Sequence, residues 1–194
     1  VRDIQSIELK ARLQLVDKGL VARNTFESLI GDSPAFRETL ARARQFSRSS
    51  VSVLVEGETG TGKELFVQGI HNESPCAGGP FVAINCAALP ESLLESELFG
   101  YEGGAFTGAR KGGKPGLFEM AHNGTIFLDE ISEISRSIQA RMLRVLQERE
   151  ILRIGGDRVI NVNIRVVTAT NKNLYRQVLD GDFRQDLYFR ISPL

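Results

Sequence analysis

The pattern of apolar and polar positions at the start of the chain has the period of a helix. Leu9, Leu13, Val16 and Leu20 are separated by four, three and four residues, which puts them on one helical face. The spacing predicts a helix over residues 1–24. This helix could pack on its own domain, or it could be a signalling or dimerising helix from an upstream module, and the sequence favours neither interpretation.

A second helix is predicted to begin at residue 34. The segment DSPAF places Ser33 as the N-cap, where its hydroxyl can accept a hydrogen bond from the first turn, and Pro34 at the first helical position. Apolar residues then recur on one side as far as Ala43, so the helix should end near Arg48.

After this helix the pattern changes to short apolar runs that are rich in valine and isoleucine, namely VSVLVEG, FVAINC, TIFLDE and NIRVVTATN. Such runs are typical of strands that are buried on both faces of a parallel sheet. Helical segments separate them at residues 64–71, 91–98 and 137–148. The alternation predicts an α/β fold with three layers, α/β/α, around a mostly parallel sheet. ILRIGGDRVINV predicts a hairpin that turns at Gly155 and Gly156.

Composition limits the classes of protein that this chain can represent. Its 194 residues are 42% hydrophobic and 25% charged, which fits one globular domain, over residues 25–194, after the first helix. Lysine and arginine balance aspartate and glutamate at 24 each, so the domain has no net field that would attract DNA or a membrane. Two cysteines and no apolar run of about 18 residues argue against a disulfide framework and a membrane span. We therefore expect a cytoplasmic fragment of a longer protein.

The strongest chemical signal is GETGTGKE, which follows the first strand run and opens a helix. In that context glycines let successive N–H groups face phosphates, and a lysine reaches the β and γ oxygens. The alternative is a glycine turn that happens to precede a helix. Mg²⁺ must use other ligands or water, because a glutamate stands where the usual serine or threonine would be. The predicted nucleotide-binding residues are Gly57, Glu58, Thr59, Gly60, Thr61, Gly62, Lys63 and Glu64.

Polar residues at the ends of three other strands complete the predicted site. TIFLDE delivers Asp129, which can hold Mg²⁺, and Glu130, which can polarise the attacking water. Asn171 could orient the same water, and Asn85 could hydrogen-bond Glu130 and hold it back from the water. The alternative for each residue is an ordinary solvated strand end or turn.

FRQDLYFR carries Arg184 and Arg190 on a predicted short helix. They could be surface arginines, or they could project into the γ-phosphate site of a neighbouring subunit. GGAFTGARKGG raises a different question, because Phe106 lies among five glycines where no helix or strand would hold it. It could bind a partner from a mobile loop, or it could fold back onto the domain.

Taken together, these motifs resemble the AAA+ ATPase domain of bacterial enhancer-binding proteins, which activate sigma-54 RNA polymerase. The resemblance runs from about residue 26 to residue 194, and GAFTGA is close to a signature of that family. A glutamate directly after the loop lysine is also common in that family. The matching segments are LIGDSPAF, GETGTGKE, FVAINCAAL, ESELFGYEGGAFTGA, GLFEMAHNGTIFLDEI, QARMLRVLQE, RIGG, ATN and FRQDLYFR.

The resemblance implies roles for individual residues. ATP and Mg²⁺ are the expected ligands, with Asp129 on the metal, Glu130 on the water, Asn85 as a switch for that glutamate and Asn171 as a sensor. In the nucleotide-binding segment LIGDSPAF, the residues concerned are Ile30 and Gly31. The residues expected to contact sigma-54 are Gly104, Ala105, Phe106, Thr107, Gly108 and Ala109.

The same resemblance implies an assembly. Arg184 and Arg190 acting in trans require a ring of identical subunits, commonly a hexamer. Family members continue into a helical lid and usually a DNA-binding helix-turn-helix domain, and the printed chain ends before both. Residues 1–24 would be the linker from an upstream sensory domain.

Two functions from other classes remain open at this stage. One is an AAA+ motor that acts on another protein or on DNA. An unfoldase would be expected to carry an aromatic pore loop, and the GAFTGA segment with its threonine argues against that. The other is a nucleotide-binding signalling module without hydrolysis, against which the intact Asp129, Glu130 and both arginines argue.

Overall fold

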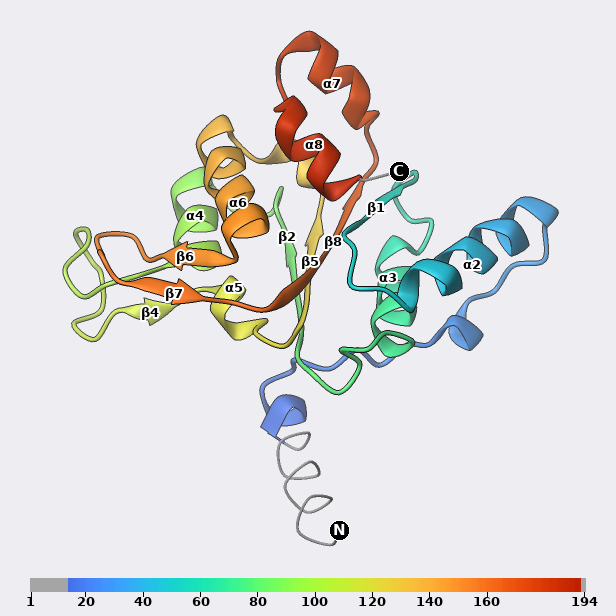
Figure 1. Cartoon of the computed structure of the whole chain (residues 1–194), viewed down its shortest axis with the longest axis horizontal. Helices are drawn as coiled ribbons and strands as arrows, with labels where there is room; N and C mark the ends of the chain where they lie inside the picture. Colours follow the sequence, from blue (N-terminus) through green and yellow to red (C-terminus); the bar gives the residue numbers. More distant parts are fainter. Residues whose placement is uncertain (1–13, 193–194) are drawn as a thin grey trace, which may run out of the picture.

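The computed structural model describes residues 14–192, and in it the four apolar runs form one parallel sheet (Figure 1). The strands lie in the order β1 (Val53–Glu56), β8 (Ile164–Thr170), β5 (Gly124–Asp129) and β2 (Phe81–Asn85). All three pairings are parallel. The carboxyl ends of the four strands therefore lie at the same edge of the sheet, which we call the carboxyl edge.

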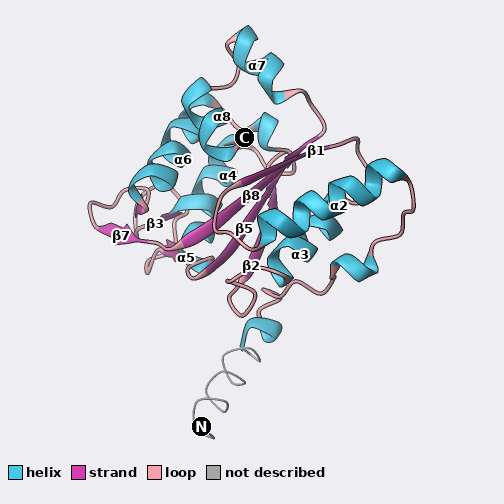
Figure 2. Cartoon of the chain, turned by 45° about the vertical axis from the view of Figure 1, so that its right-hand side comes forward, coloured by secondary structure: helices cyan, strands magenta, loops and turns pink. Residues whose placement is uncertain are grey.

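Helices cover both faces of this sheet (Figure 2). One face carries α2 (Pro34–Ser47) and α3 (Lys63–Asn72). The opposite face carries α4 (Glu91–Phe99), α5 (Leu117–Met120), α6 (Arg136–Glu148) and α8 (Gln185–Ile191). The predicted α/β fold with three layers is confirmed.

Alternation along the strands divides the apolar side chains into two cores. On β5, Ile126 and Leu128 pack into the core beneath α4, α5 and α6, whereas Phe127 packs into the core beneath α2 and α3. On β8, Val166 and Val167 divide in the same way. Successive side chains of a strand point to opposite faces, so continuous apolar runs are needed to fill both cores.

The smaller elements agree with the turn and cap signals. Ser33 Oγ accepts a hydrogen bond from the N–H of Phe36 at 3.1 Å, which confirms the predicted N-cap of α2. The predicted hairpin is formed by the antiparallel strands β6 (Glu150–Leu152) and β7 (Val159–Asn161).

None of the helices in residues 14–192 is long and apolar enough to cross a membrane. The remaining described elements are η1 (Phe26–Ser28), β3 (Gly100–Tyr101), β4 (Lys114–Pro115), η2 (Ile131–Glu133) and α7 (Leu174–Asp180).

The first predicted helix ends earlier than its apolar spacing suggested. Leu9 and Leu13 lie outside the described residues, and residues 14–17 are helical. Gly19 has φ +69°, and the N–H of Leu20 donates to the carbonyl of Leu15 at 2.8 Å, which is the hydrogen-bond pattern of a helix ending at a left-handed glycine. Leu20 therefore does not continue the helical face; it packs against the larger core, and its carbonyl accepts from the N–H of Phe81.

Gln68 on α3 fixes the segment that follows this turn. Its Oε1 accepts from the backbone N–H of Arg23 at 3.0 Å, from the N–H of Asn24 at 3.0 Å and from the Asn24 side chain at 2.8 Å. Its Nε2 donates to Glu64 at 3.2 Å. Gln68 is buried, so one amide holds the entering chain against the helix that carries the glycine-rich loop.

We expect Gln68→Ala to lower the free energy of unfolding by about 1–3 kcal/mol, because two backbone N–H groups lose their acceptor. Urea unfolding of the 194-residue chain measures this difference. Gln147→Ala is the matched control, because Gln147 is exposed on α6, and this variant should unfold with the wild type. Equal loss of stability in both variants would contradict the role assigned to Gln68.

Candidate nucleotide site

The loop between β1 and α3 has a backbone that can face an anion. Gly60 and Gly62 have φ of +82° and +85°, in the left-handed region that favours glycine. Gly62 is the N-cap residue of α3, which begins at Lys63. The unpaired N–H groups of that first turn and the helix dipole favour a phosphate at this position.

Lys63 lies folded over the loop that it follows. Its Nζ donates to the carbonyl oxygens of Gly57 at 2.8 Å and Glu58 at 3.1 Å, and the side chain is half-buried. An ammonium group has three protons, so it can keep one carbonyl contact while it donates to a phosphate oxygen. The lysine is thus positioned by the loop itself.

An apolar pocket of about 250 Å³ lies beside this loop. Leu29, Phe36 and Phe66 line it together with Gly62 and Lys63, so α2, α3 and the segment before α2 all contribute. Aromatic and aliphatic side chains next to a phosphate loop are suited to a flat heterocyclic ring. The pocket provides a place for the base of a nucleotide.

Ile30 and Gly31, which the resemblance assigns to the nucleotide, do not line this pocket. The Ile30 side chain is fully exposed. A Cβ on Gly31 would come within 2.8 Å of the Phe36 ring, so a glycine lets the chain pass over that ring. Sequence reasoning did not assign Leu29 and Phe66 to the site, and their only signal was their apolar character near the loop.

Asp129 and Glu130 end β5 at the carboxyl edge, and both are half-buried. Asp129 Oδ1 accepts from the N–H of Glu130 at 3.0 Å, and Glu130 adopts a left-handed conformation with φ +52°. A non-glycine residue in this region is uncommon, and such positions cluster at functional sites. The two carboxylates therefore lie at a sharp turn at the carboxyl edge of the sheet.

Asn171 connects this carboxylate pair to the glycine-rich loop. Its side-chain Nδ2 donates to Thr59 Oγ1 at 3.0 Å, and its backbone N–H donates to Glu130 Oε2 at 3.3 Å. The strand order explains the contact, since β8 lies between β1 and β5 and the N–H of Gly57 donates to the carbonyl of Thr170. The ends of three strands are thus joined by hydrogen bonds.

Asn85 has a different partner from the one predicted. Its Nδ2 donates to Asp129 Oδ2 at 3.3 Å, and its Oδ1 accepts from the N–H of Ala87 at 2.9 Å. The hydrogen bond to Glu130 is therefore not present. The register explains this difference, because Asn85 pairs with Asp129 across β2 and β5.

The donor set fits Mg²⁺ that is shared with a nucleotide. Within residues 14–192, no group of three or more His, Cys, Asp or Glu side chains is arranged to hold a metal ion. Mg²⁺ usually keeps several waters and uses one or two carboxylates together with substrate phosphates. Asp129 and Glu130 beside the loop supply that smaller set, whereas the Glu64 carboxylate is engaged by Gln68.

Arg184 and Arg190 lie apart from these contacts. Arg184 is the N-cap residue of α8 and forms an ion pair with Asp186 at 2.7 Å, and the hydrogen bond with that carboxylate raises the pKa of the arginine. Arg190 is exposed in the last turn. Among the described residues, neither guanidinium forms an ion pair with Asp129 or Glu130, and Arg190 has no acidic partner.

The segment of residues 104–109 extends beside the tip of the β6–β7 hairpin (Figure 1). Gly104 and Gly108 have φ of +81° and +95°. Phe106 is 45% exposed, and its ring meets Tyr101 edge to face at 4.9 Å between centroids. Phe106 therefore rests on the surface of the domain and keeps nearly half of its area open to a partner.

Arg153 ties the base of this segment to the body of the domain. Its guanidinium forms ion pairs with Glu119 at 2.7 Å and with Glu102 at 3.2 Å. Burial alone would raise the pKa of Glu119, but hydrogen bonds from Arg153 and the backbone of Gly116 lower it overall. Sequence reasoning did not single out Arg153, because its partners lie 34 and 51 residues away.

The sequence model of the "Sigma-54 interaction domain" matches residues 29–194, which is most of the chain. The chain belongs to this family. Sequence and structure thus agree with the resemblance carried by GAFTGA and the glycine-rich loop.

Curated relatives of this sigma-54 interaction domain are regulatory or control proteins by name. A Nif-specific regulatory protein of Azorhizobium caulinodans is 56% identical over 170 residues, which cover 88% of this chain and 28% of that protein. A signal-transduction and transcriptional-control protein of Clostridium beijerinckii is 51% identical over 195 residues, covering 100% of this chain and 30% of that protein. The chain spans about 30% of the length of such relatives.

Solved structures agree with this family. NtrX from Brucella abortus in complex with ATP matches 100% of this chain and 39% of that one, with a TM-score of 0.78 and 31% identity. The P-loop NTPase domain of a sigma-54 activator from E. coli matches 77% of this chain and 97% of that one, with a TM-score of 0.54. At 16% identity, the second match supports the fold alone.

We expect Cys86 of the sigma-54 interaction domain to resist alkylation while the chain is folded. Burial, together with the charges of Asp129 and Glu130, raises the pKa of Cys86 to about 12, so at pH 8 about one molecule in 10,000 carries the thiolate. Mass spectrometry after iodoacetamide treatment at pH 8 should find Cys76 labelled first, and Cys86 labelled only after denaturation. Labelling of both at equal rates in the folded chain would contradict this environment.

Proposed function

We propose that this domain binds ATP at the carboxyl edge of the sheet and hydrolyses it. The observation that carries the proposal is the pair of hydrogen bonds from Asn171 to Thr59 and to Glu130. These bonds bring the phosphate loop, a carboxylate base and a polar sensor to one place. The match to the ATP complex of NtrX over the whole chain supports the same ligand.

Lys63 and the N–H groups at the start of α3 would bind the phosphates, while Leu29, Phe36 and Phe66 would hold the base. Asp129 would hold Mg²⁺, which when bound neutralises charge on the β and γ phosphates. Asn85 donates to Asp129 and would keep that carboxylate oriented.

Glu130 would act on the attacking water. A carboxylate close to the γ-phosphate can accept a hydrogen bond from water and align it for attack. The left-handed turn at Glu130 and the N–H of Asn171 fix the position of that carboxylate. Loss of the γ-phosphate would therefore alter the contacts of Glu130 and Asn171 and, through Thr59, those of the loop.

We further propose that residues 104–109 contact sigma-54 and that hydrolysis remodels the closed promoter complex to the open one. The support is Phe106, which is half exposed on a glycine-flanked segment, and membership of a family whose description is sigma-54 interaction. Thr107 is exposed beside it and can donate a hydrogen bond to the partner. Gly104 and Gly108 supply the conformational freedom that raising and lowering the segment requires.

The proposal includes a ring of identical subunits, with six as the expected number. Arg184 and Arg190 do not pair with Asp129 or Glu130 of their own subunit, and in a ring they would reach the γ-phosphate of a neighbour. An arginine supplied in trans makes hydrolysis depend on assembly. Ring formation would then act as a switch for activity.

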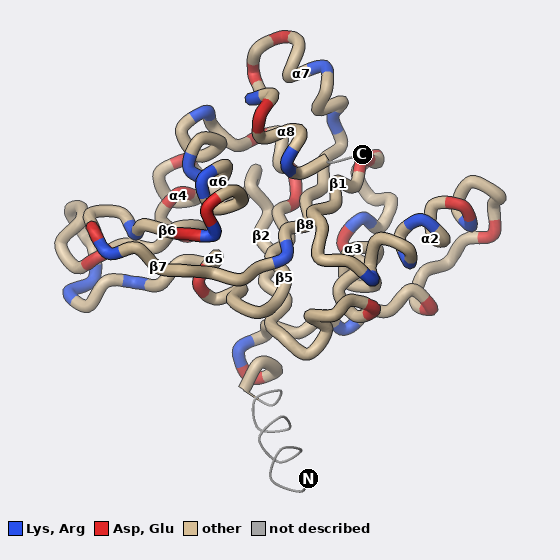
Figure 3. Tube along the Cα trace, viewed as in Figure 1, with Lys and Arg blue, Asp and Glu red and all other residues tan. Residues whose placement is uncertain are grey.

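DNA would be bound by a part of the protein outside this chain. Lysine plus arginine equals aspartate plus glutamate at 24 each, and basic and acidic positions are interspersed on both sides of the sheet (Figure 3). A chain without net positive charge has little attraction for a phosphate backbone. The expected site of action is the cytoplasm, where promoters and RNA polymerase are.

We expect Glu130→Gln in the full-length protein to bind ATP and Mg²⁺ about as well as the wild type and to lose nearly all turnover. The amide keeps the shape of the side chain and removes the charge that polarises water. Glu133→Gln is the matched control three residues away, because Glu133 pairs with Lys172 outside the site. Phosphate release and nucleotide binding measured on one preparation decide the matter, and full turnover by Glu130→Gln would favour a different base.

We expect Phe106→Ala and Thr107→Ala in the full-length protein to keep ATPase activity within a few fold and to abolish open-complex formation. The changed side chains lie outside the nucleotide site, so the loss of the partner contact should not slow hydrolysis. Tyr175→Ala, which removes an exposed aromatic on α7, should leave both activities near wild type. Normal transcription activation by both loop variants would overturn the role proposed for residues 104–109.

A further inference from the structure

Another cavity lies at the opposite edge of the sheet, where β5 and β8 begin. Its volume is about 370 Å³. Gly124, Ile164 and Arg165, at the amino ends of the two strands, form part of its wall. The other lining residues are Ser49, Ser50, Pro75, Cys76, Asn123, Arg149 and Asn163.

Arg165 is a buried cation with an incomplete set of partners. Its side chain lies under the end of α2, where Nη1 donates to the carbonyl of Ser47 at 3.1 Å and Nη2 to that of Phe46 at 2.8 Å. Its Nε is fully buried and has no hydrogen-bond partner. No carboxylate in residues 14–192 forms an ion pair with this guanidinium, and burial lowers the pKa of Arg165.

Such an arrangement is costly unless something completes it. A buried polar group without a partner costs about 1–3 kcal/mol, and a buried charge without a counter-charge costs more. Arg165 is 3% exposed, so bulk solvent does not compensate for the missing anion. The Cys76 thiol, when ionised, favours the charged guanidinium, but Cys76 Sγ already contacts Ser74 Oγ and Thr125 Oγ1 at 3.1 and 3.3 Å.

A second arginine lies on the same cavity. Arg149 ends α6 in a left-handed conformation with φ +59°, and its Nη1 donates to the carbonyl of Ile164 at 2.7 Å. Among the described residues it has no acidic partner either. Two guanidinium groups with spare donors therefore share one cavity, with the hydroxyls of Ser49 and Ser50 and the amide of Asn163 on the same lining.

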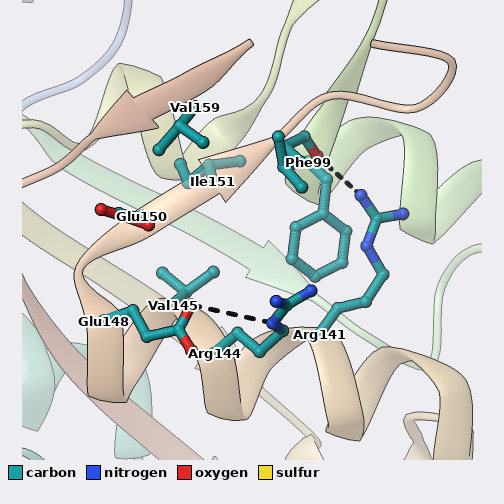
Figure 4. A pocket seen from close by; sticks show the side chains of 9 residues that line it. Phe99, Arg141, Arg144, Val145, Glu148, Glu150, Ile151 and Val159 are labelled. Atoms are coloured by element: carbon teal, nitrogen blue, oxygen red, sulfur yellow. Dashed lines mark hydrogen bonds and ion pairs between the residues drawn. The ribbon is translucent and has the colours of Figure 1, made fainter. Parts of the chain in front are cut away.

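The groove between α6 and the β6–β7 hairpin provides a contrast (Figure 4). It is also about 370 Å³ and also carries two arginines, but both are paired. Arg141 binds Glu95 and lies over the ring of Phe99 at 4.2 Å, and Arg144 pairs with Glu148. That groove offers no unpaired cation to a ligand, whereas the cavity at the amino edge offers two.

We propose that the cavity at the amino edge binds a small anion through Arg149 and Arg165, with an oxyanion group of phosphate or carboxylate chemistry. Guanidinium forks match such groups through paired N–H donors. The site is separate from the nucleotide edge, since its lining residues begin the strands whose other ends carry Asp129 and Asn171. The proposal does not depend on ATP hydrolysis.

Inorganic phosphate and acetate are the probes, each titrated into the ¹⁵N-labelled 194-residue chain at constant ionic strength, with chloride as reference. Backbone amide shifts of Gly124 and Arg165 report on the cavity, and those of residues 57–63 report on the phosphate loop. We expect a saturable response at the cavity. A response to phosphate alone identifies a phosphate group as the ligand, and a response to acetate alone identifies a carboxylate group. A response to both probes identifies a site that accepts either oxyanion.

Three variants separate the two sites. Arg149→Gln should weaken the cavity response at least tenfold and keep the loop response to phosphate, while Lys63→Ala should do the reverse. Arg144→Gln is the matched control, an exposed arginine on the same helix, and should keep both responses. Circular dichroism verifies folding, and Arg149→Lys serves if Arg149→Gln is unfolded, with weakening again expected. Two results would overturn the proposal. One is a cavity response to phosphate and acetate that stays linear, as it does for chloride. The other is an equal cavity response in the Arg149 variant and the wild type.

Discussion

The pairing of β8 with both β1 and β5 is the constraint on which the nucleotide site depends. Because all three strands are parallel, their carboxyl ends meet at one edge, and β8 places Asn171 between the glycine-rich loop and Glu130. In open α/β sheets, ligands bind in the crevice outside the carboxyl ends of the strands. Here the strand order places the polar end of β8 against the ends of both β1 and β5.

The segment of residues 104–109 is anchored on the face of the sheet that α5 covers. Arg153 on the hairpin joins Glu102 at the base of the loop to Glu119 on α5, and the N–H of Glu102 donates to the carbonyl of Ile154. Beyond this anchored base, glycines leave residues 104–109 few internal hydrogen bonds to break. A fixed base with a loose tip suits a segment that must present an aromatic side chain in more than one position.

Much of the fold could be predicted from sequence because local patterns carried it. Apolar runs identified four strands, Ser33 marked the start of α2, and the glycine pair marked the hairpin. The first helix was extended wrongly through Leu20, because that residue fits the helical spacing and also packs on the core. In the site, the loop and the carboxylates had local signals. The partner of Asn85 followed from strand register, and the apolar pocket is formed by four separate segments. These depend on tertiary structure, which a single sequence does not display.

The two edges of the sheet share elements but differ in how a ligand could act through them. All seven residues of β8 are buried, and a strand hydrogen-bonded on both sides has a single arrangement. Since coupling between sites requires an element with two arrangements, we do not expect an anion near Arg165 to act by moving β8. The helix α2 is a better candidate for connecting the two sites. Its carboxyl end supplies the carbonyls that bind Arg165, and near its other end Phe36 lines the apolar pocket. An anion bound to the unpartnered Nε of Arg165 would leave the two carbonyl contacts of this guanidinium in place, so an effect on the pocket beside Phe36 would pass along α2.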